Sequence, residues 1–181
     1  MLPHELLWHH EARRLRGIGF LLGLCLALII PNLGLPQGIT GPLVNALLLG
    51  AAVWLGREQA LLLGLITPLS AALRGVLPLP LWVMIPFIAL GNATLVSVYS
   101  ALRSRGHWLA LGAAALAKCA LLSAAVTWLT LRPLRLAIGG APQMVALPAS
   151  LVNMMRWPQL ATALAGGALL WLIERGVQRR A

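Results

Sequence analysis

The sequence predicts an all-α integral membrane protein with six transmembrane helices and both termini in the cytoplasm. Three observations support this prediction. First, 60% of the 181 residues are hydrophobic and only 10% are charged, whereas soluble domains carry roughly a quarter charged residues. Second, six apolar runs follow one another, each bounded by charged residues or by Gly and Pro. Third, most basic residues lie at the ends of these runs, as the positive-inside rule expects.

The first three runs cover 17–34, 42–55 and 58–73. Run 17–34 follows the basic segment EARRLR, and no small-residue cleavage site follows it, so we interpret it as a membrane helix and not as a signal peptide. In the second run, Pro42 suits the first helical turn. The second and third runs are short for a span of ~20 residues, so one re-entrant hairpin is the alternative to two spans.

The last three runs cover 81–102, 107–130 and 157–174. The fourth follows the segment PLP, the fifth contains Lys118, and the sixth begins WPQLATALAGG. A helical turn or two from Pro148 onward could extend the sixth run backwards. Taken together the chain forms one membrane domain. It comprises a cytoplasmic N-terminal segment 1–16, a six-helix bundle 17–175 and a cytoplasmic tail 176–181.

The arginines predict the orientation of this bundle. With the N-terminus inside, the cytoplasmic side holds nine arginines: Arg13, Arg14, Arg16, Arg57, Arg103, Arg105, Arg175, Arg179 and Arg180. The outer side holds four: Arg74, Arg132, Arg135 and Arg156. This asymmetry favours cytoplasmic termini. The outer loops 31–41 and 131–150 are too apolar for disorder, so we expect them to fold back over the outer mouth.

Enzyme signatures are nearly absent. The chain has no Asp, and its four Glu lie outside the middle of every run, which excludes a carboxylate pair or an acid-held magnesium site in the membrane interior. The histidines fall outside the runs, and the two cysteines lack metal spacing. We therefore expect no enzyme activity, no catalytic residue, no metal and no cofactor. No basic face alternates with stacking aromatics, so we expect no nucleic acid partner.

Lys118 is the main polar feature of the predicted interior. It lies about eleven residues from either end of its run, or roughly 16 Å at 1.5 Å per residue. Ionisable residues at that depth are costly and usually face a cavity or a partner. Since no intramembrane acid exists, three explanations remain open: a neutral lysine, a lysine bonded to backbone carbonyls freed near a proline, or a lysine that binds an anionic ligand.

Other polar residues complete a candidate binding site. Asn92 is predicted at the depth of Lys118, and Pro-Gln-x-x-Thr occurs twice, at 36–40 and 158–162. Buried amides often only join helices, and interfacial Arg and Trp are ordinarily anchors. These residues could instead line an outward-facing pocket. The candidate substrate-binding residues are Lys118, Asn92, Gln37, Thr40, Asn45, Asn153, Arg156, Trp157 and Gln159.

Small residues form a ridge on the first helix. Gly19, Gly23 and Ala27 recur every four residues and would let another helix approach closely. The partner helix could belong to this chain or to another subunit.

Three segments carry a resemblance to a known family: LPQGITGPLVNALLLGAAVWLG, LLGLITPLSAALRGVLPLPLWVMIPFIALGNA and RWPQLATALAGG. With the six spans and the capping first loop, they resemble the substrate-binding S components of energy-coupling factor (ECF) micronutrient importers. The resemblance covers roughly 17–175. It implies a multi-pass protein of the bacterial cytoplasmic (inner) membrane that binds a vitamin or related micronutrient from outside.

The resemblance also implies partners. S components have no ATPase of their own and dock onto a membrane coupling subunit driven by two cytoplasmic ATPases. Family docking positions match Gly19, Gly23 and Ala27, where Gly replaces the family's usual Ala at two. Family binding sites draw on the first outer loop and helices four to six, which include Gln37, Thr40, Asn92, Lys118, Asn153 and Gln159. The missing intramembrane acids favour a neutral or anionic substrate.

Two other functions remain open. A membrane assembly or structural protein without a ligand would not need a charged Lys118. A secondary transporter would work on an ion gradient without ATPase partners.

Overall fold

The computed structural model describes residues 3–73, 75, 79–132, 134–138, 141–145 and 147–179. Predictions for Arg74, Arg180, the outermost terminal residues and parts of the 131–150 loop fall outside this range. The side chains of Arg13 and Arg135 also lie outside it. Seven α-helices run in order: α1 (Pro3–Ile29), α2 (Gln37–Trp54), α3 (Arg57–Leu73), α4 (Ile85–Leu102), α5 (His107–Leu131), α6 (Ala149–Met154) and α7 (Trp157–Gln178). Three 3-10 turns join them: η1 (Ile30–Asn32), η2 (Leu79–Met84) and η3 (Arg103–Arg105).

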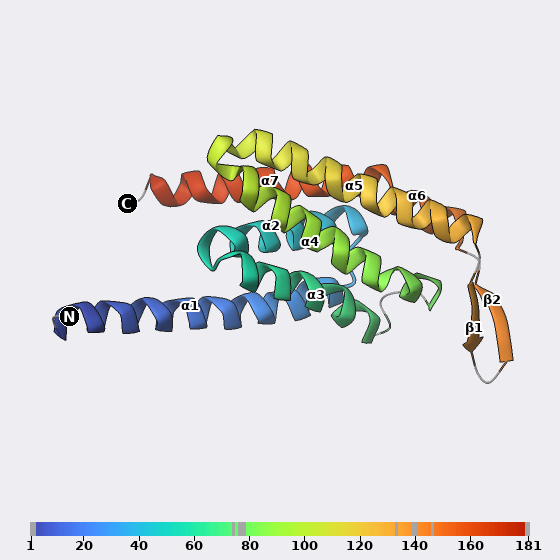
Figure 1. The fold of residues 1–181 in the computed structure, drawn as a ribbon, viewed down its shortest axis with the longest axis horizontal. Coiled ribbons are helices and arrows are strands. Elements are labelled where there is room, and N and C mark those ends of the chain that lie inside the picture. The colour runs from blue at the N-terminus through green and yellow to red at the C-terminus, as the bar shows by residue number, and fades with distance from the viewer. Residues whose placement is uncertain are drawn as a thin grey trace.

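The long helices lie side by side along the long axis of the molecule (Figure 1). Helix α2 packs on α7 and α3, while α4 packs on α5 and α3, and α1 covers α3. Helix α1 begins and α7 ends at the same end of the bundle, opposite the β1–β2 hairpin (Figure 1). Within the described residues, five segments are long and apolar enough to cross a membrane. Helix α3 has 17 residues and is not one of them.

A β-hairpin departs from the all-α prediction. Strands β1 (Leu134–Ile138) and β2 (Ala141–Val145) pair antiparallel, with Leu134 opposite Val145. The sequence prediction treated this stretch as loop because its apolar character suggested only that it would fold back. The segment LRLAI in fact has an alternating start, and two glycines follow it in the sequence. Alternation followed by a turn signal is typical of a hairpin.

Two other boundaries differ from the prediction. Helix α2 begins at Gln37 rather than 42, because Pro36 precedes the helix and its carbonyl accepts the N–H of Thr40. The helical turns suggested from Pro148 onward are present, but they form a short separate helix, α6, and do not extend α7. The chain breaks between them at Arg156, whose backbone is not helical (φ −109°, ψ −118°), and the proline after Trp157 disfavours a continuous helix there.

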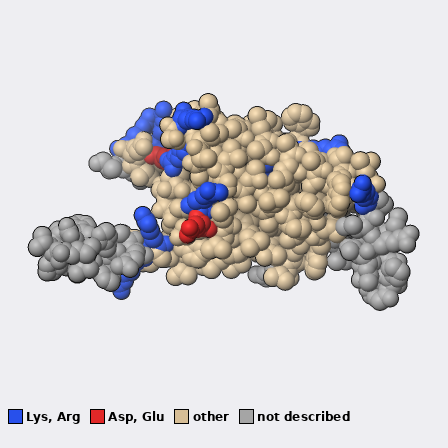
Figure 2. Space-filling model, viewed as in Figure 1, with Lys and Arg blue, Asp and Glu red and all other residues tan. Residues whose placement is uncertain are grey.

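Charged side chains are distributed unevenly over the bundle. On the face shown in Figure 2, Lys and Arg gather near the end where α1 begins and α7 ends, and fewer lie at the hairpin end. Most of the surface between is uncharged (Figure 2). Many large apolar side chains of the bundle are exposed, among them Leu21, Leu62 and Leu116. An uncharged belt with exposed leucines is what a bilayer requires of a membrane-embedded protein.

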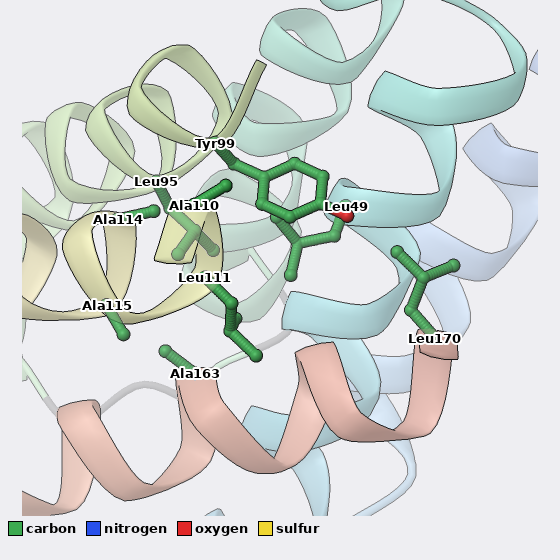
Figure 3. Close-up of a cluster of buried hydrophobic side chains, with 9 residues drawn as sticks. All are labelled: Leu49, Leu95, Tyr99, Ala110, Leu111, Ala114, Ala115, Ala163 and Leu170. Atoms are coloured by element: carbon green, nitrogen blue, oxygen red, sulfur yellow. The ribbon is translucent and has the colours of Figure 1, made fainter. Parts of the chain in front are cut away.

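Small residues let the helices approach closely in the core. One buried cluster combines Leu49, Leu95 and Tyr99 with four alanines and two further leucines (Figure 3). The alanines come from α5 and α7, so these helices meet with little side chain between them. Since lipid tails are as apolar as leucine, helices in a bilayer associate through such close van der Waals packing.

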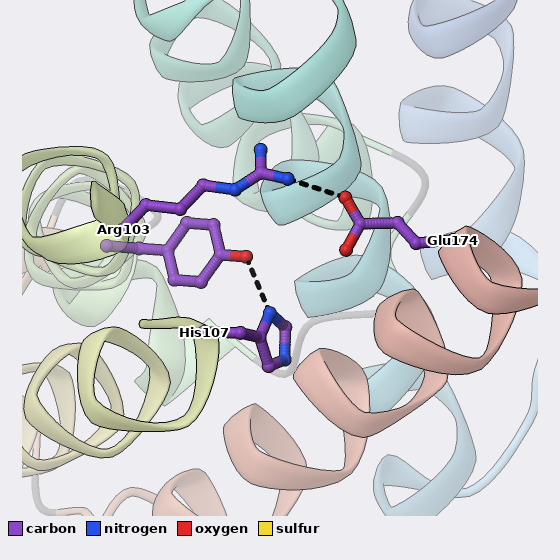
Figure 4. A network of polar contacts seen from close by, with 4 residues as sticks. Arg103, His107 and Glu174 are labelled. Carbon is purple, nitrogen blue, oxygen red and sulfur yellow. Dashed lines mark hydrogen bonds and ion pairs between the residues drawn. The ribbon is translucent and has the colours of Figure 1, made fainter. Parts of the chain in front are cut away.

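A polar network ties three helices together at the end where α1 begins. Arg103 Nη2 donates to Glu174 Oε1 over 2.6 Å, and Tyr99 Oη lies 2.9 Å from His107 Nδ1 (Figure 4). These residues belong to α4, η3, α5 and α7. The Arg103 side chain is 37% exposed, so the ion pair adds at most about 1 kcal/mol of stability. Its contribution is chiefly to hold the ends of α4 and α7 in register.

Gly166 offers a test of the α2–α7 contact. A Cβ at this position would lie 2.7 Å from the Pro42 carbonyl oxygen and 2.9 Å from the Ala46 nitrogen. Because those are backbone atoms, α2 would have to move. We expect Gly166→Ala to lower the free energy of unfolding by about 1–3 kcal/mol.

The matched control is Gly112→Ala in α5, where an added Cβ meets nothing within 4 Å. It should be neutral or stabilising by at most about 1 kcal/mol. Thermal unfolding in detergent measures both variants. Equal stability of the two would contradict the close α2–α7 packing.

Candidate functional site

A cavity of about 350 Å³ lies inside the bundle. Its wall draws on α2, α3, α4, α5, α6 and α7, and on the segment that follows α1. The polar lining residues are Gln37, Thr40, Asn45, Thr67, Asn92, Lys118 and Gln159. Apolar side chains make up the remainder, with Leu, Met, Pro, Val, Ile and Ala represented. An apolar cavity with a few polar groups is the usual form of a small-molecule site.

Lys118 carries the positive charge on this wall. It lies eleven residues after His107, the first residue of α5, and its side chain is 3% exposed. Nζ donates hydrogen bonds to Asn45 Oδ1 over 2.7 Å and to Asn92 Oδ1 over 2.8 Å. A lysine ammonium has three N–H donors. The third has no partner among the described residues.

Asn92 is held in place from its other side. Its Nδ2 donates to the Gly64 carbonyl oxygen over 2.9 Å and to Thr67 Oγ1 over 3.2 Å. In a regular helix the N–H of residue 68 would bond that carbonyl, but Pro68 has no N–H. The proline therefore leaves the Gly64 carbonyl without its helical N–H donor, and the carbonyl accepts instead from the Asn92 amide and from Thr67 Oγ1. This contact orients Asn92 with Oδ1 toward Lys118.

These contacts decide among the expected partners of Lys118. A proline-freed carbonyl is present, but it bonds Asn92, and the lysine bonds two side-chain amides instead. Among the described residues no Glu lines the cavity. Lys118 Nζ is thus bonded by two neutral amide oxygens, with no acidic group among the described lining residues. Such an arrangement holds a lysine in place and leaves its charge available to a ligand.

At the hairpin end the cavity is lined by α6 and by the start of α2. Gln159 Nε2 donates to the Met154 carbonyl oxygen over 3.2 Å, which links α7 to α6. Thr40 Oγ1 donates to the Leu35 carbonyl oxygen over 3.1 Å, which fixes the segment leading into α2. Figure 1 shows α6 near the hairpin end of the bundle. The cavity therefore lies between Lys118 and the hairpin end.

The structure brings together six of the nine predicted substrate-binding residues: Lys118, Asn92, Gln37, Thr40, Asn45 and Gln159. Asn153, Arg156 and Trp157 are not among the lining residues. Trp157 is 75% exposed, and Arg156 Nη2 donates to Thr127 Oγ1 over 3.3 Å. All three lie around the α6–α7 break, where the chain turns their side chains away from the cavity.

Sequence reasoning missed the contribution of α3. Thr67 and Pro68 both line the cavity, and Gly64 anchors Asn92. A signal was present in the sequence GLITP. A proline in the interior of an apolar helix frees the carbonyl four residues earlier, so a buried amide was needed nearby. The same reasoning could have linked Asn92 to α3.

The predicted docking ridge makes contacts within the chain. A Cβ at Gly19 would lie 2.8 Å from Leu55, and one at Gly23 would lie 3.0 Å from Leu63. Ala27 is fully buried. Gly19 and Gly23 also border an apolar groove of about 480 Å³ between α1, α2 and α7. These small residues thus let α1 pack closely against Leu55 and Leu63 of the same chain. Docking of another subunit on the ridge stays a prediction.

In the part of the chain that the structure describes, no group of three or more His, Cys, Asp or Glu residues could hold a metal ion. Comparison of the chain with family models, with curated proteins and with solved structures found no match.

Proposed function

We propose that this chain is the substrate-binding S component of an ECF-type importer. It captures a small neutral or anionic micronutrient from outside the cell and passes it to an ATP-driven coupling module. The observation that carries the proposal is the cavity of about 350 Å³, which has a solvated lysine on its wall and no acidic lining residue among those described. Pockets of this size and composition bind small organic molecules.

The orientation of the bundle in the membrane belongs to the same proposal. Six helices span the bilayer, with α3 as a short span of roughly 26 Å at 1.5 Å per residue. The end that carries Arg57, Arg103 and Arg105 faces the cytoplasm, because basic residues favour that side. The hairpin end, and with it the part of the cavity lined by α6 and the start of α2, then faces outward. A ligand from outside would enter near α6.

Coupling to ATP hydrolysis requires another subunit. Helix α1 is the candidate contact, because it bears exposed Leu15, Leu21 and Leu22 and borders the apolar groove. In lipid such side chains need no partner. We assign these α1 leucines as the surface that contacts the membrane coupling subunit, which two cytoplasmic ATPases drive.

Mass spectrometry of the protein purified from its native membrane tests this function. We expect one small organic molecule per chain and co-purification of a membrane subunit with two ATPases. Purification after a high-salt wash provides the control for loosely bound material. A protein that retains no small molecule and associates with no ATPase would contradict the proposal. Uptake by reconstituted vesicles on an ion gradient alone would favour a secondary transporter instead.

A further inference from the structure

The charges on the cavity wall define the ligand more narrowly. Lys118 is the single cation among the described lining residues, and no acid accompanies it. Arg156 does not join it, because its guanidinium bonds Thr127 outside the cavity. An ion buried without a counter-charge is costly. A ligand with one negative charge would neutralise the site, whereas a dianion would leave one charge uncompensated.

The free hydrogen-bonding groups match a carboxylate. Lys118 has used two of its three donors on Asn45 and Asn92. Asn45 uses its carbonyl oxygen on the lysine, which leaves its amide N–H groups as further donors. Thr40 and Thr67 already donate to the Leu35 and Gly64 carbonyls. Lys118 and Asn45 therefore hold free donors side by side, while Gln37 and Gln159 bring further amide groups to the wall. A carboxylate accepts through two adjacent oxygens.

The rest of the wall suits an aliphatic chain. Leu35, Val44, Ile88, Leu151, Met154 and Met155 line it, and no aromatic residue is among the described lining residues. Methionine adapts its shape to flexible partners, while a flat ring would find no aromatic face for stacking. The volume equals roughly a dozen water molecules at ~30 Å³ each. That space suits a ligand of about as many non-hydrogen atoms.

We infer that the ligand is an organic monocarboxylate with a flexible aliphatic body. Its carboxylate is held by Lys118 Nζ and the Asn45 amide, and its body lies against the leucine and methionine side chains toward the hairpin end. This inference deepens the proposed function and rests on it. It goes beyond a neutral or anionic micronutrient by assigning the charge, the head group and the character of the body.

A matched ligand series on the unmodified protein tests the head group. The purified chain is first unfolded gently and refolded in lipid nanodiscs to remove retained ligand, and its recovery is checked by circular dichroism and gel filtration. Octanoate, octanamide and octylamine share one chain and differ only in the head group. Binding is measured by calorimetry, with empty nanodiscs as the control for lipid partitioning. We expect octanoate to bind about ten- to a hundred-fold more tightly than octanamide, because hydrogen bonds to charged groups are stronger, and octylamine not to bind.

Nicotinate tests the body of the ligand, because it keeps the carboxylate on a flat ring. We expect it to bind more weakly than octanoate. Lys118→Met should remove the preference for octanoate over octanamide, and it is compared with Arg156→Gln, which leaves the cavity wall unchanged.

The outcomes separate the inference from the proposed function. Equal or tighter binding of octanamide, octylamine or nicotinate, or recovery of a cationic or neutral natural ligand, overturns the inference and leaves the binding function in place. Binding of none of the four, together with no retained ligand from the native membrane, overturns both. The inference is also overturned if the Lys118→Met variant in nanodiscs still binds octanoate more tightly than octanamide, because the lysine would then not hold the carboxylate.

Discussion

Replacing Lys118 with methionine is expected to abolish retention of the anionic ligand through purification. The methionine fills the same space but cannot donate a hydrogen bond or supply charge. Removing one partner of a buried, hydrogen-bonded charge pair costs about 2–5 kcal/mol of binding, which is a loss of roughly thirty- to a few thousand-fold in affinity. Mass spectrometry of the purified variant and calorimetry with octanoate measure the loss.

The control for Lys118→Met is Arg156→Gln. It removes another positive charge, but from a side chain that bonds Thr127 and does not line the cavity. It should retain ligand as the unmodified protein does. Both variants must elute as folded, monodisperse protein for the comparison to count. Full ligand retention by Lys118→Met would assign the lysine a structural role and overturn the carboxylate assignment, while the binding function would remain in place.

Replacing Asn92 with alanine is expected to destabilise the bundle by about 2–4 kcal/mol. The change removes one hydrogen bond from each of three buried groups: the Lys118 Nζ, the Gly64 carbonyl and the Thr67 hydroxyl. Lys118 keeps its bond to Asn45, and the Thr67 hydroxyl still donates to the Gly64 carbonyl. A lost hydrogen bond costs about 0.5–1.5 kcal/mol and one to a charged group about 1.5–3 kcal/mol, although single interhelical hydrogen bonds in membrane proteins average only about 0.6 kcal/mol. Denaturant titration in mixed micelles measures the free energy of unfolding.

A double-mutant cycle with Pro68→Ala identifies the cause of this destabilisation. Alanine at 68 restores the N–H that a helix directs to the Gly64 carbonyl. Asn92→Ala should then cost about 1 kcal/mol less in the Pro68→Ala background than in the natural one. Thr94→Ala is the control on the same helix, because Thr94 Oγ1 donates only to the Leu90 carbonyl of its own helix. Additivity of the two changes would show that the proline does not create the need for Asn92.

Part of the candidate site was predictable because polar residues are few in this chain. Lys118 and Asn92 stood out in apolar runs, and the segment around Gln37 and Thr40 was placed at the mouth of the second helix. The structure places all four on one cavity. By contrast, Arg156 and Trp157 were predicted from their position near the outer end of the last helix. Only the break between α6 and α7 decides that their side chains point away.

The sequence by itself determined a helical protein suited to a membrane. This was possible because the evidence is local: the length of each apolar run, the arginines at the ends of the runs and the absence of acids within them. It also determined that Lys118 could not pair with a carboxylate. The partners that the lysine does have lie 73 and 26 residues away along the chain. A helix that is apolar on every side does not reveal which face it buries. Only the packing of α4 on α5 and of α2 on α4 and α7 brings Asn92 and Asn45 to the lysine, because helix rotation in a bilayer is decided by contacts between helices.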